Sequence, residues 1–385
     1  MTREEKYVIA AIRAVVNEIA PPKAPSDLDW ERAARLAVKH SVGNLFCYAV
    51  EKMEEIPQEI LARLVEYKKK AVLREATQEI ELSILRKKFN AAGIRFMPLK
   101  GILLKSHYPK PDMRMMGDID ILFDVTRAEE VREIMQGMGY TACKFATSGG
   151  TDVYQKPPIM NLELHRALLS RPKEWVPHFS DAWDRAVQKD GCEYTMTPED
   201  YYVFLIAHLL KHYVGYGTGI RSVLDVWVCL SAMEFDEEVL KARFEALGIT
   251  EFVGNIEALS RVWFGDAESS PLLDEMGDFI IMSGVYGEKL TGIMARTVAT
   301  DSAKSEYFFR RLFLKREVMV DEFPILKKHP AMLPLCWVSR LGKRAFRKET
   351  ITREMQIMQT VDGDKASALQ SLHKRVGIKE SMFQE

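Results

Sequence analysis

The chain has 385 residues, of which 47% are hydrophobic and 28% charged, and its formal net charge is −1. These values are ordinary for a globular protein of two or three domains that buries a sizeable core. The balanced charge excludes the bulk positive field of many nucleic-acid-binding proteins, and only a local basic patch stays open.

The cysteines and the apolar runs indicate the cellular compartment that we expect for the protein. The five cysteines are scattered, with no CxxC pair, which argues against a disulfide framework and a structural zinc site. Free thiols are typical of a reducing compartment, so we expect a cytoplasmic protein. Acidic residues interrupt the N-terminal segment early, which makes it a poor signal peptide. No apolar run approaches the ~18 residues of a membrane span.

The first 90 residues are predicted to be helical. Apolar residues recur at helical spacing from Val8 to Ile19, and a segment rich in Glu, Lys, Arg and Ala runs from about Pro57 to Ala92. Gly93 is expected to end this long helix.

The middle of the chain changes to alternating short strands and helices. A short helix over 101–108 and a longer one over 127–138 interrupt the strand patterns. Strands are predicted over residues 94–99, 118–124, 140–145, 151–155 and 159–165.

Helical patterns return after about residue 172. The predicted helices begin at Pro198 and then cover 221–233, 236–246, 250–263 and 270–284. We therefore predict an α+β fold with a small mixed-sheet core at 91–170. Helical regions at 1–90 and 171–385 would flank it, the second completing the cleft.

The stretch DIDILFD, residues 118–124, is the most informative one. Alternate residues of a strand point to the same face, so Asp118 and Asp120 would project together while Ile119 and Ile121 pack behind them. Two such carboxylates repel each other unless a cation lies between them, and oxygen ligands suit Mg²⁺ or Mn²⁺. The alternative is a solvated edge strand whose acidic side chains face water.

The residues before this strand favour phosphate chemistry. Lys100 and Gly101 lie between a strand and a short helix, where a glycine lets backbone N–H groups approach a phosphate. Arg114 could hold a phosphate oxygen through two nitrogens. Taken singly, the pair could be an ordinary turn and Arg114 a surface salt bridge. The whole order of elements is much harder to obtain by accident.

This segment resembles the polymerase-beta-like nucleotidyltransferase superfamily, and more narrowly an uncharacterised bacterial nucleotidyltransferase family. The resemblance is good over about residues 30–230, although Lys-Gly stands where the superfamily usually has Gly-Ser. The matching residues are Lys100-Gly101, Tyr108-Pro109, Arg114, Asp118-Ile119-Asp120, Leu162 to His165, and the helix from Tyr201 through His208 and His212 to Asp225.

The resemblance implies a third carboxylate on a later strand, and Glu163 is our candidate. It would complete a metal site with Asp118 and Asp120 or act as a general base. Nearby, His208 and His212 lie one helical turn apart and, with His165, are candidate cleft or acceptor residues. With Glu163 and His165 they could instead bind zinc.

The reaction implied is Mg²⁺-dependent transfer of a nucleoside monophosphate from ATP or another nucleoside triphosphate to an acceptor hydroxyl, with release of pyrophosphate. Lys100, Gly101 and Arg114 would position the nucleotide. The net charge favours a small-molecule or protein acceptor over a long nucleic acid. Two alternatives are a metal-dependent phosphohydrolase and an inactive nucleotide-binding family member.

Two further expectations follow. The basic segment 308–348 is predicted to be a solvated helical face rather than a site for RNA or lipid headgroups. Asp120→Asn should abolish transfer and leave the melting temperature equal to or above that of the wild type, because it relieves repulsion from Asp118.

Overall fold

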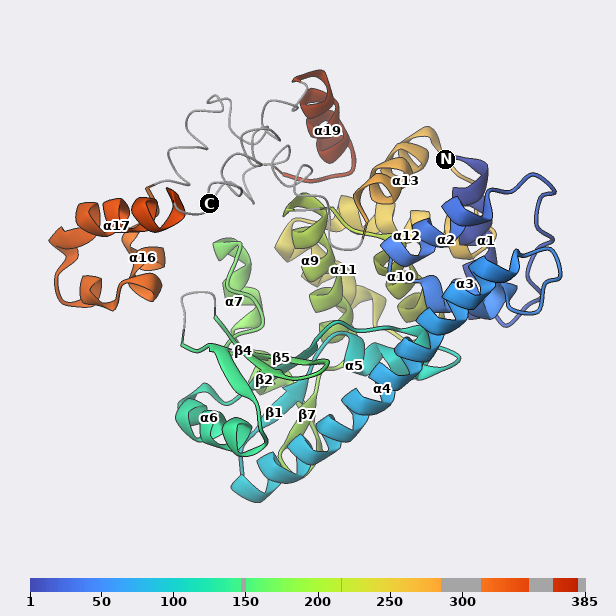
Figure 1. Ribbon diagram of the computed structural model, residues 1–385. Coiled ribbons are helices and arrows are strands. Elements are labelled where there is room, and N and C mark those ends of the chain that lie inside the picture. The colour runs from blue at the N-terminus through green and yellow to red at the C-terminus, as the bar shows by residue number, and fades with distance from the viewer. Residues whose placement is uncertain (147–149, 216, 285–312, 346–362, 380–385) are drawn as a thin grey trace.

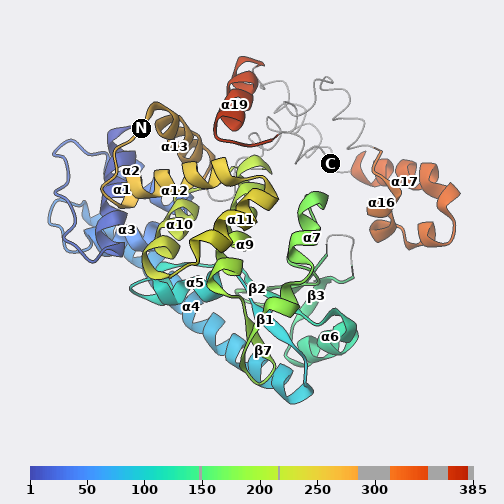
Figure 2. The same ribbon diagram turned by 180° about the vertical axis from the view of Figure 1, so that it is seen from behind.

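A computed structural model describes residues 1–146, 150–215, 217–284, 313–345 and 363–379. It confirms the α+β class, with one mixed sheet between helical layers (Figures 1 and 2). Among these residues, no helix is long and apolar enough to cross a membrane.

The N-terminal region is helical, as predicted. The first helix begins with a capping box, in which Thr2 and Glu5 satisfy each other's backbone N–H groups. The long fourth helix ends where Gly93 adopts a left-handed φ of 65°. The helices are α1 (Arg3–Val16), α2 (Trp30–Lys39), α3 (Gly43–Val50) and α4 (Gln58–Ala92).

The sheet has seven strands in the order β3-β4-β5-β2-β1-β7-β6. Its two central strands, β2 and β5, run parallel, whereas β1 pairs antiparallel with β2. The strands are β1 (Phe96–Pro98), β2 (Ile119–Phe123), β3 (Thr141–Lys144), β4 (Thr151–Lys156), β5 (Met160–His165), β6 (Val187–Asp190) and β7 (Glu193–Thr195). The first five confirm the predicted strands. The last two were not predicted and extend the sheet beyond residue 170.

The helices at 101–104 and 128–137 and those between 198 and 283 follow the predicted order, whereas those at 176–179, 182–185 and 363–375 were not predicted. The short pieces between strands are α5 (Gly101–Leu104), α6 (Ala128–Gly137), α7 (Val176–Phe179) and α8 (Ala182–Arg185). The C-terminal layer contains α9 (Pro198–Gly215), α10 (Ile220–Ala232), α11 (Glu237–Leu247), α12 (Thr250–Phe264), α13 (Pro271–Ser283) and α19 (Gly363–Arg375).

Side-chain alternation along β2 assigns the two faces of the sheet to different cores. Ile119, Ile121 and Phe123 pack with residues of α4 and α6. Leu122 belongs to the larger core, which joins α1–α3 to the C-terminal helices. Asp120 shares its face with Leu122, two residues away, and therefore points toward the layer that contains α9.

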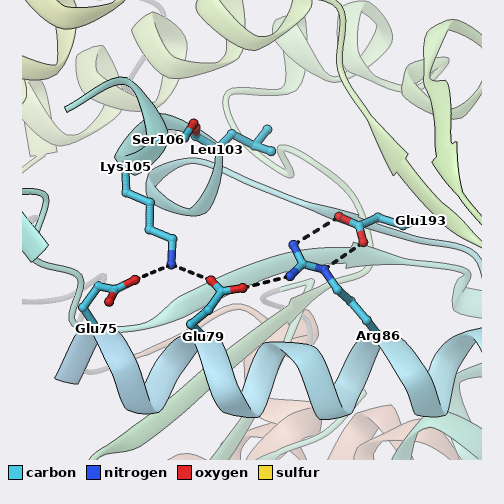
Figure 3. A network of polar contacts seen from close by, with 7 residues as sticks. All are labelled: Glu75, Glu79, Arg86, Leu103, Lys105, Ser106 and Glu193. Atoms are coloured by element: carbon cyan, nitrogen blue, oxygen red, sulfur yellow. Dashed lines mark hydrogen bonds and ion pairs between the residues drawn. The ribbon is translucent and has the colours of Figure 1, made fainter. Parts of the chain in front are cut away.

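A polar network anchors the segment after β1 to α4 (Figure 3). The buried Lys105 ammonium lies 3.0 Å from Glu75 and 2.8 Å from Glu79. Arg86 continues the network, at 3.1 Å from Glu79 and 2.8 Å from Glu193 of β7. The long helix thus holds both the turn after β1 and the neighbouring strand in place.

The described part of the basic segment is helical, as expected. Met319, Leu326 and Cys336 form a small core there, with Trp337 packed against it. The helices are α16 (Arg316–Glu322) and α17 (Leu333–Ala345). Residues 308–312 and 346–348 of the predicted segment lie outside the described residues.

Candidate active site

The turn between β1 and α5 brings the backbone of Lys100 next to β2 and α9. The amide N–H of Leu99 donates to the carbonyl of Asp120 at 2.9 Å, and the Tyr201 hydroxyl donates to the carbonyl of Lys100 at 3.0 Å. Lys100 itself has φ 49° and ψ −121°, a conformation that favours glycine. A lysine is held there against this backbone cost, which is a common feature of functional sites.

Gly101 follows in a position with no room for a side chain. A Cβ atom would lie 2.6 Å from the sulfur of Met116 and 3.0 Å from Nη1 of Arg114. The glycine is therefore required by the close approach of the segment before β2.

Asp120, Glu163 and His165 form the centre of the site. Parallel pairing of β2 and β5 sets Asp120 directly opposite Glu163, and His165 is two residues further along the same face. One ligand atom from each of the three lies within 4.8 Å of the others. The strand register thus brings Asp120 into one cluster with Glu163 and His165, which follow it by more than 40 residues in the sequence.

The carboxylate of Asp120 is buried and accepts from two side chains at one oxygen. Nζ of Lys100 and Nε2 of His165 both lie 2.7 Å from its Oδ1. Burial alone would raise the pKa of Asp120, but the charge of Lys100 and the hydrogen bond from His165 lower it below its ordinary value. Asp120 is therefore ionised throughout the physiological pH range.

The pKa values of the other two carboxylates, Asp118 and Glu163, are raised rather than lowered. Burial and the charge of Asp120 raise the pKa of Asp118, which is half-buried and immediately precedes β2. Burial and then the charges of Asp118 and Asp120 raise the pKa of Glu163. Asp118 is thus coupled electrostatically to the cluster, although the three side chains within 4.8 Å do not include it.

The donor set of this cluster fits a divalent cation. Two carboxylates and one imidazole offer oxygen and nitrogen ligand atoms to a shared position. Carboxylate oxygens suit Mg²⁺ and Mn²⁺, and Mn²⁺ tolerates the imidazole nitrogen better than Mg²⁺ does. Mutual repulsion among Asp118, Asp120 and Glu163 is the physical reason that a cation would stabilise the group.

Arg114 is engaged elsewhere. Its Nε and Nη2 donate to the two oxygens of Asp225 in α10 at 2.7 and 2.8 Å, and the Tyr108 hydroxyl donates to the same carboxylate at 2.7 Å. All three residues are buried. The contact with phosphate predicted for Arg114 stays a prediction, and the geometry shows instead how Arg114 fixes the segment before β2.

His208 and His212 line the adjoining face of α9. Their ring centroids lie 4.4 Å apart. Burial and then the charge of Lys100 lower the pKa of both, to about 4 for His212, so both rings are neutral at pH 7. The predicted zinc alternative requires both rings to lie with the ligand atoms of Glu163 and His165. Among the described residues, neither ring belongs to that cluster.

Sequence reasoning missed three side chains near the cluster. Tyr201 was named only as the start of a matching helix, yet its hydroxyl holds the carbonyl of Lys100. Lys211 and Arg171 were not singled out at all; burial and then the charges of Lys100 and Arg171 lower the pKa of Lys211. Lys211 adjoins His212 in the sequence, and that position was the available signal.

Comparison with known proteins gives one match. The model of the family described as "Uncharacterised nucleotidyltransferase" matches residues 26–265. No curated protein and no solved structure matches the chain. The match spans β1, β2 and β5 and most of the helices that surround them, including α9. Because it covers more than half of the 385 residues, the chain belongs to this uncharacterised nucleotidyltransferase family.

Proposed function

We propose that the protein transfers a nucleoside monophosphate from a nucleoside triphosphate to an acceptor hydroxyl and releases pyrophosphate. The observation that carries this proposal is the juxtaposition of Asp120, Glu163 and His165 on β2 and β5, beside the Lys100-Gly101 turn. The family match supports nucleotidyl transfer as the reaction class.

Asp118 and Asp120 are proposed to hold Mg²⁺ or Mn²⁺, with Glu163 or His165 completing the ligand set. Such a cation, when bound, neutralises charge on the phosphate oxygens and on the attacking and leaving groups. Asp120 is suited to this role because its low pKa keeps it anionic, and His165 orients it through a hydrogen bond of 2.7 Å.

Glu163 has a second candidate role as the base that takes the proton of the acceptor hydroxyl. Its pKa is raised by burial and by the neighbouring aspartates, which moves it toward the operating pH that a general base needs. A ligand role predicts that Glu163→Gln weakens Mn²⁺ binding. A base role predicts unchanged Mn²⁺ binding and slower transfer.

Lys100 and Gly101 are proposed to contact the triphosphate. The Lys100 ammonium already lies at the cluster, and Gly101 follows it directly at the start of α5. Arg114 contributes by holding the intervening segment through Asp225. It is thus a positioning residue in this proposal.

The test is a screen of the four nucleoside triphosphates with Mg²⁺ or Mn²⁺, monitoring pyrophosphate release over pools of small-molecule, protein and RNA acceptors. We expect release that depends on both the cation and an acceptor. Binding of a triphosphate without turnover in every pool would instead indicate the inactive, nucleotide-binding alternative. Phosphate release with stoichiometric zinc would indicate the phosphohydrolase.

A further inference from the structure

The long helix α4 carries a line of exposed residues on the side that faces away from the protein. Buried residues such as Leu82 and Phe89 hold the opposite side of the helix against the sheet. Members of the exposed line recur every three or four residues, so they lie above one another along the helix. This outer stripe consists of Ala62, Glu66, Lys69, Leu73, Ala76, Ile80, Ile84, Lys87 and Ala91.

The middle of the outer stripe is apolar although it faces solvent. Leu73 and Ile80 are 65% and 62% exposed, and Ile84 continues the apolar row. Thr77 lies beside Ala76, and its hydroxyl donates to the carbonyl of Leu73 at 2.8 Å, which satisfies that donor within the helix. Figures 1 and 2 show α4 along the outer edge of the molecule. A helix that is apolar on two opposite sides is normally covered on both, and contiguous exposed apolar residues mark an interaction surface.

The outer stripe is complementary to itself when a second α4 helix runs in the opposite direction. A two-fold axis that passes between Ala76 and Thr77 places each member of the stripe opposite another residue of the same exposed side. Residues that face each other in this way are the basis of an isologous interface between two copies of one chain. The pairs are Ala76 with Thr77, Leu73 with Ile80, Lys69 with Ile84, Glu66 with Lys87 and Ala62 with Ala91.

The central pairs match in size. Ala76 and Thr77 are small, so the axes of the two helices can approach closely where they cross. Leu73 of each copy then meets Ile80 of the other, once on either side of the crossing point. Large apolar side chains thus flank a small centre, an arrangement that lets the two surfaces interlock.

The outer pairs match in charge. Glu66 of each copy faces Lys87 of the other, which gives two opposite-charge pairs per dimer. Glu66 contacts only the exposed Lys70 in its own helix, at 3.6 Å, and such a surface pair contributes little. The aliphatic part of Lys69 can cover Ile84 while its ammonium stays in water. A parallel arrangement would instead bring each lysine beside the same lysine of the second copy, and like charges repel.

We propose that the protein forms a homodimer in which the α4 helices of two copies pack antiparallel through the outer stripe. Removal of Leu73, Ile80 and Ile84 of both copies from water supplies the main driving force. The stripe over 62–91 is roughly 43 Å long at 1.5 Å per residue, so the helices can stay in contact over several turns. The carboxylate cluster stays open in this dimer, because Asp120 points toward the layer of α9 on the other face of the sheet.

The first experiment measures the dissociation constant of the dimer of the full chain by sedimentation equilibrium. Ile80→Glu should weaken dimerisation by about 100-fold, because it brings two charges into the apolar part of the interface. Leu335→Glu on α17 is the matched control, since Leu335 is 65% exposed but lies on another helix, and it should leave the constant unchanged. Both substitutions are at exposed positions, so the circular dichroism spectra should equal that of the wild type.

A charge exchange tests the antiparallel register. Glu66→Lys and Lys87→Glu should each weaken dimerisation by about tenfold, because each change turns two attractive pairs into two repulsive ones. The double variant Glu66→Lys/Lys87→Glu restores opposite charges across the two-fold axis. Its dissociation constant should return to within about threefold of the wild-type value.

Each contrary result has a definite meaning. A wild-type chain that stays monomeric up to its solubility limit would overturn the inference, as would a dimer that Ile80→Glu leaves intact. A double variant that shows the combined losses of Glu66→Lys and Lys87→Glu would overturn the antiparallel register. A monomer that binds phosphatidylserine vesicles, and loses this binding in Ile80→Glu, would assign the stripe to a membrane surface instead. The proposed function does not depend on any of these outcomes.

Discussion

Nε2 of His165 lies 2.7 Å from Oδ1 of Asp120, on the parallel strand next to its own, and the same oxygen accepts from Lys100 at 2.7 Å. One carboxylate thus holds together the turn after β1, strand β2 and the end of β5. Its removal should affect both stability and chemistry.

Asp120→Asn should reduce transfer by about 1000-fold, because a cation ligand contributes several kcal/mol to transition-state stabilisation. The sequence predicted an equal or higher melting temperature, from relief of repulsion with Asp118. The ion pair between Lys100 and Asp120 argues for the opposite outcome. Asn keeps an oxygen that can accept from Lys100, but Lys100, whose side chain is only 14% exposed, loses its counter-charge. This should cost about 1–3 kcal/mol of unfolding free energy in metal-free protein.

Urea denaturation without metal, combined with the pyrophosphate assay, checks this prediction. Asp190→Asn on the exposed strand β6 is the matched control and should change neither quantity. Wild-type turnover by Asp120→Asn would exclude the proposed mechanism.

Arg114→Lys should destabilise the protein by about 3 kcal/mol. Lysine keeps the charge but cannot make the two parallel hydrogen bonds to buried Asp225, and one oxygen of the carboxylate loses its donor. In the folded variant we expect the affinity for a nucleoside triphosphate to stay within about twofold of the wild type, since the side chain acts through the segment before β2. A tenfold or greater loss of affinity with unchanged stability would instead indicate that Arg114 contacts the phosphate directly, as the sequence predicted.

Gly101→Ala should cost about 1–3 kcal/mol, because the new Cβ would overlap the Met116 side chain at 2.6 Å from its sulfur. In a Met116→Ala background the same substitution should cost less, which a double-mutant cycle measures by urea denaturation. Gly137→Ala, in α6 with no atom within 4 Å of its added Cβ, is the control and should be neutral or stabilising. Equal costs of Gly101→Ala in both backgrounds would show that the contact with Met116 is not the cause.

His40 should make the protein less stable in mild acid. Its ring is buried, Nδ1 accepts from the amide of Ile220 at 3.1 Å, and Nε2 lies 3.1 Å from the carbonyl of Ile281. Burial lowers its pKa to about 4, below the ordinary 6.5, so its stabilisation is present above pH 6.5 and is lost as the pH falls toward 4. Between pH 7 and pH 5 this should remove about 2 kcal/mol.

Unfolding free energies from urea denaturation at the two pH values test this. His40→Gln, which cannot titrate, should lose that share of the pH dependence whatever its absolute stability. The same substitution at exposed His107 should leave the pH dependence as in the wild type. If the stability of His40→Gln depended on pH as that of the wild type does, the His40 ring would have to become protonated at the same pH in the folded and unfolded states.

The sequence by itself determined the local elements and the nature of the candidate site. Helical periodicity and Gly93 defined α4 almost to the residue, and strict alternation over 118–124 identified β2 and the face of Asp120. Glu163 and His165 were also recoverable, because they alternate with buried leucines on a second strand. In each case the signal lies within a few consecutive residues, where backbone geometry alone relates them.

Only the tertiary structure decided the partners. The register between β2 and β5 sets Asp120 opposite Glu163, and nothing in either segment specifies that alignment. Packing of α10 against the segment before β2 places Arg114 where it pairs with Asp225. Likewise, β6 and β7 are short, largely polar strands whose place depends on pairing with β1.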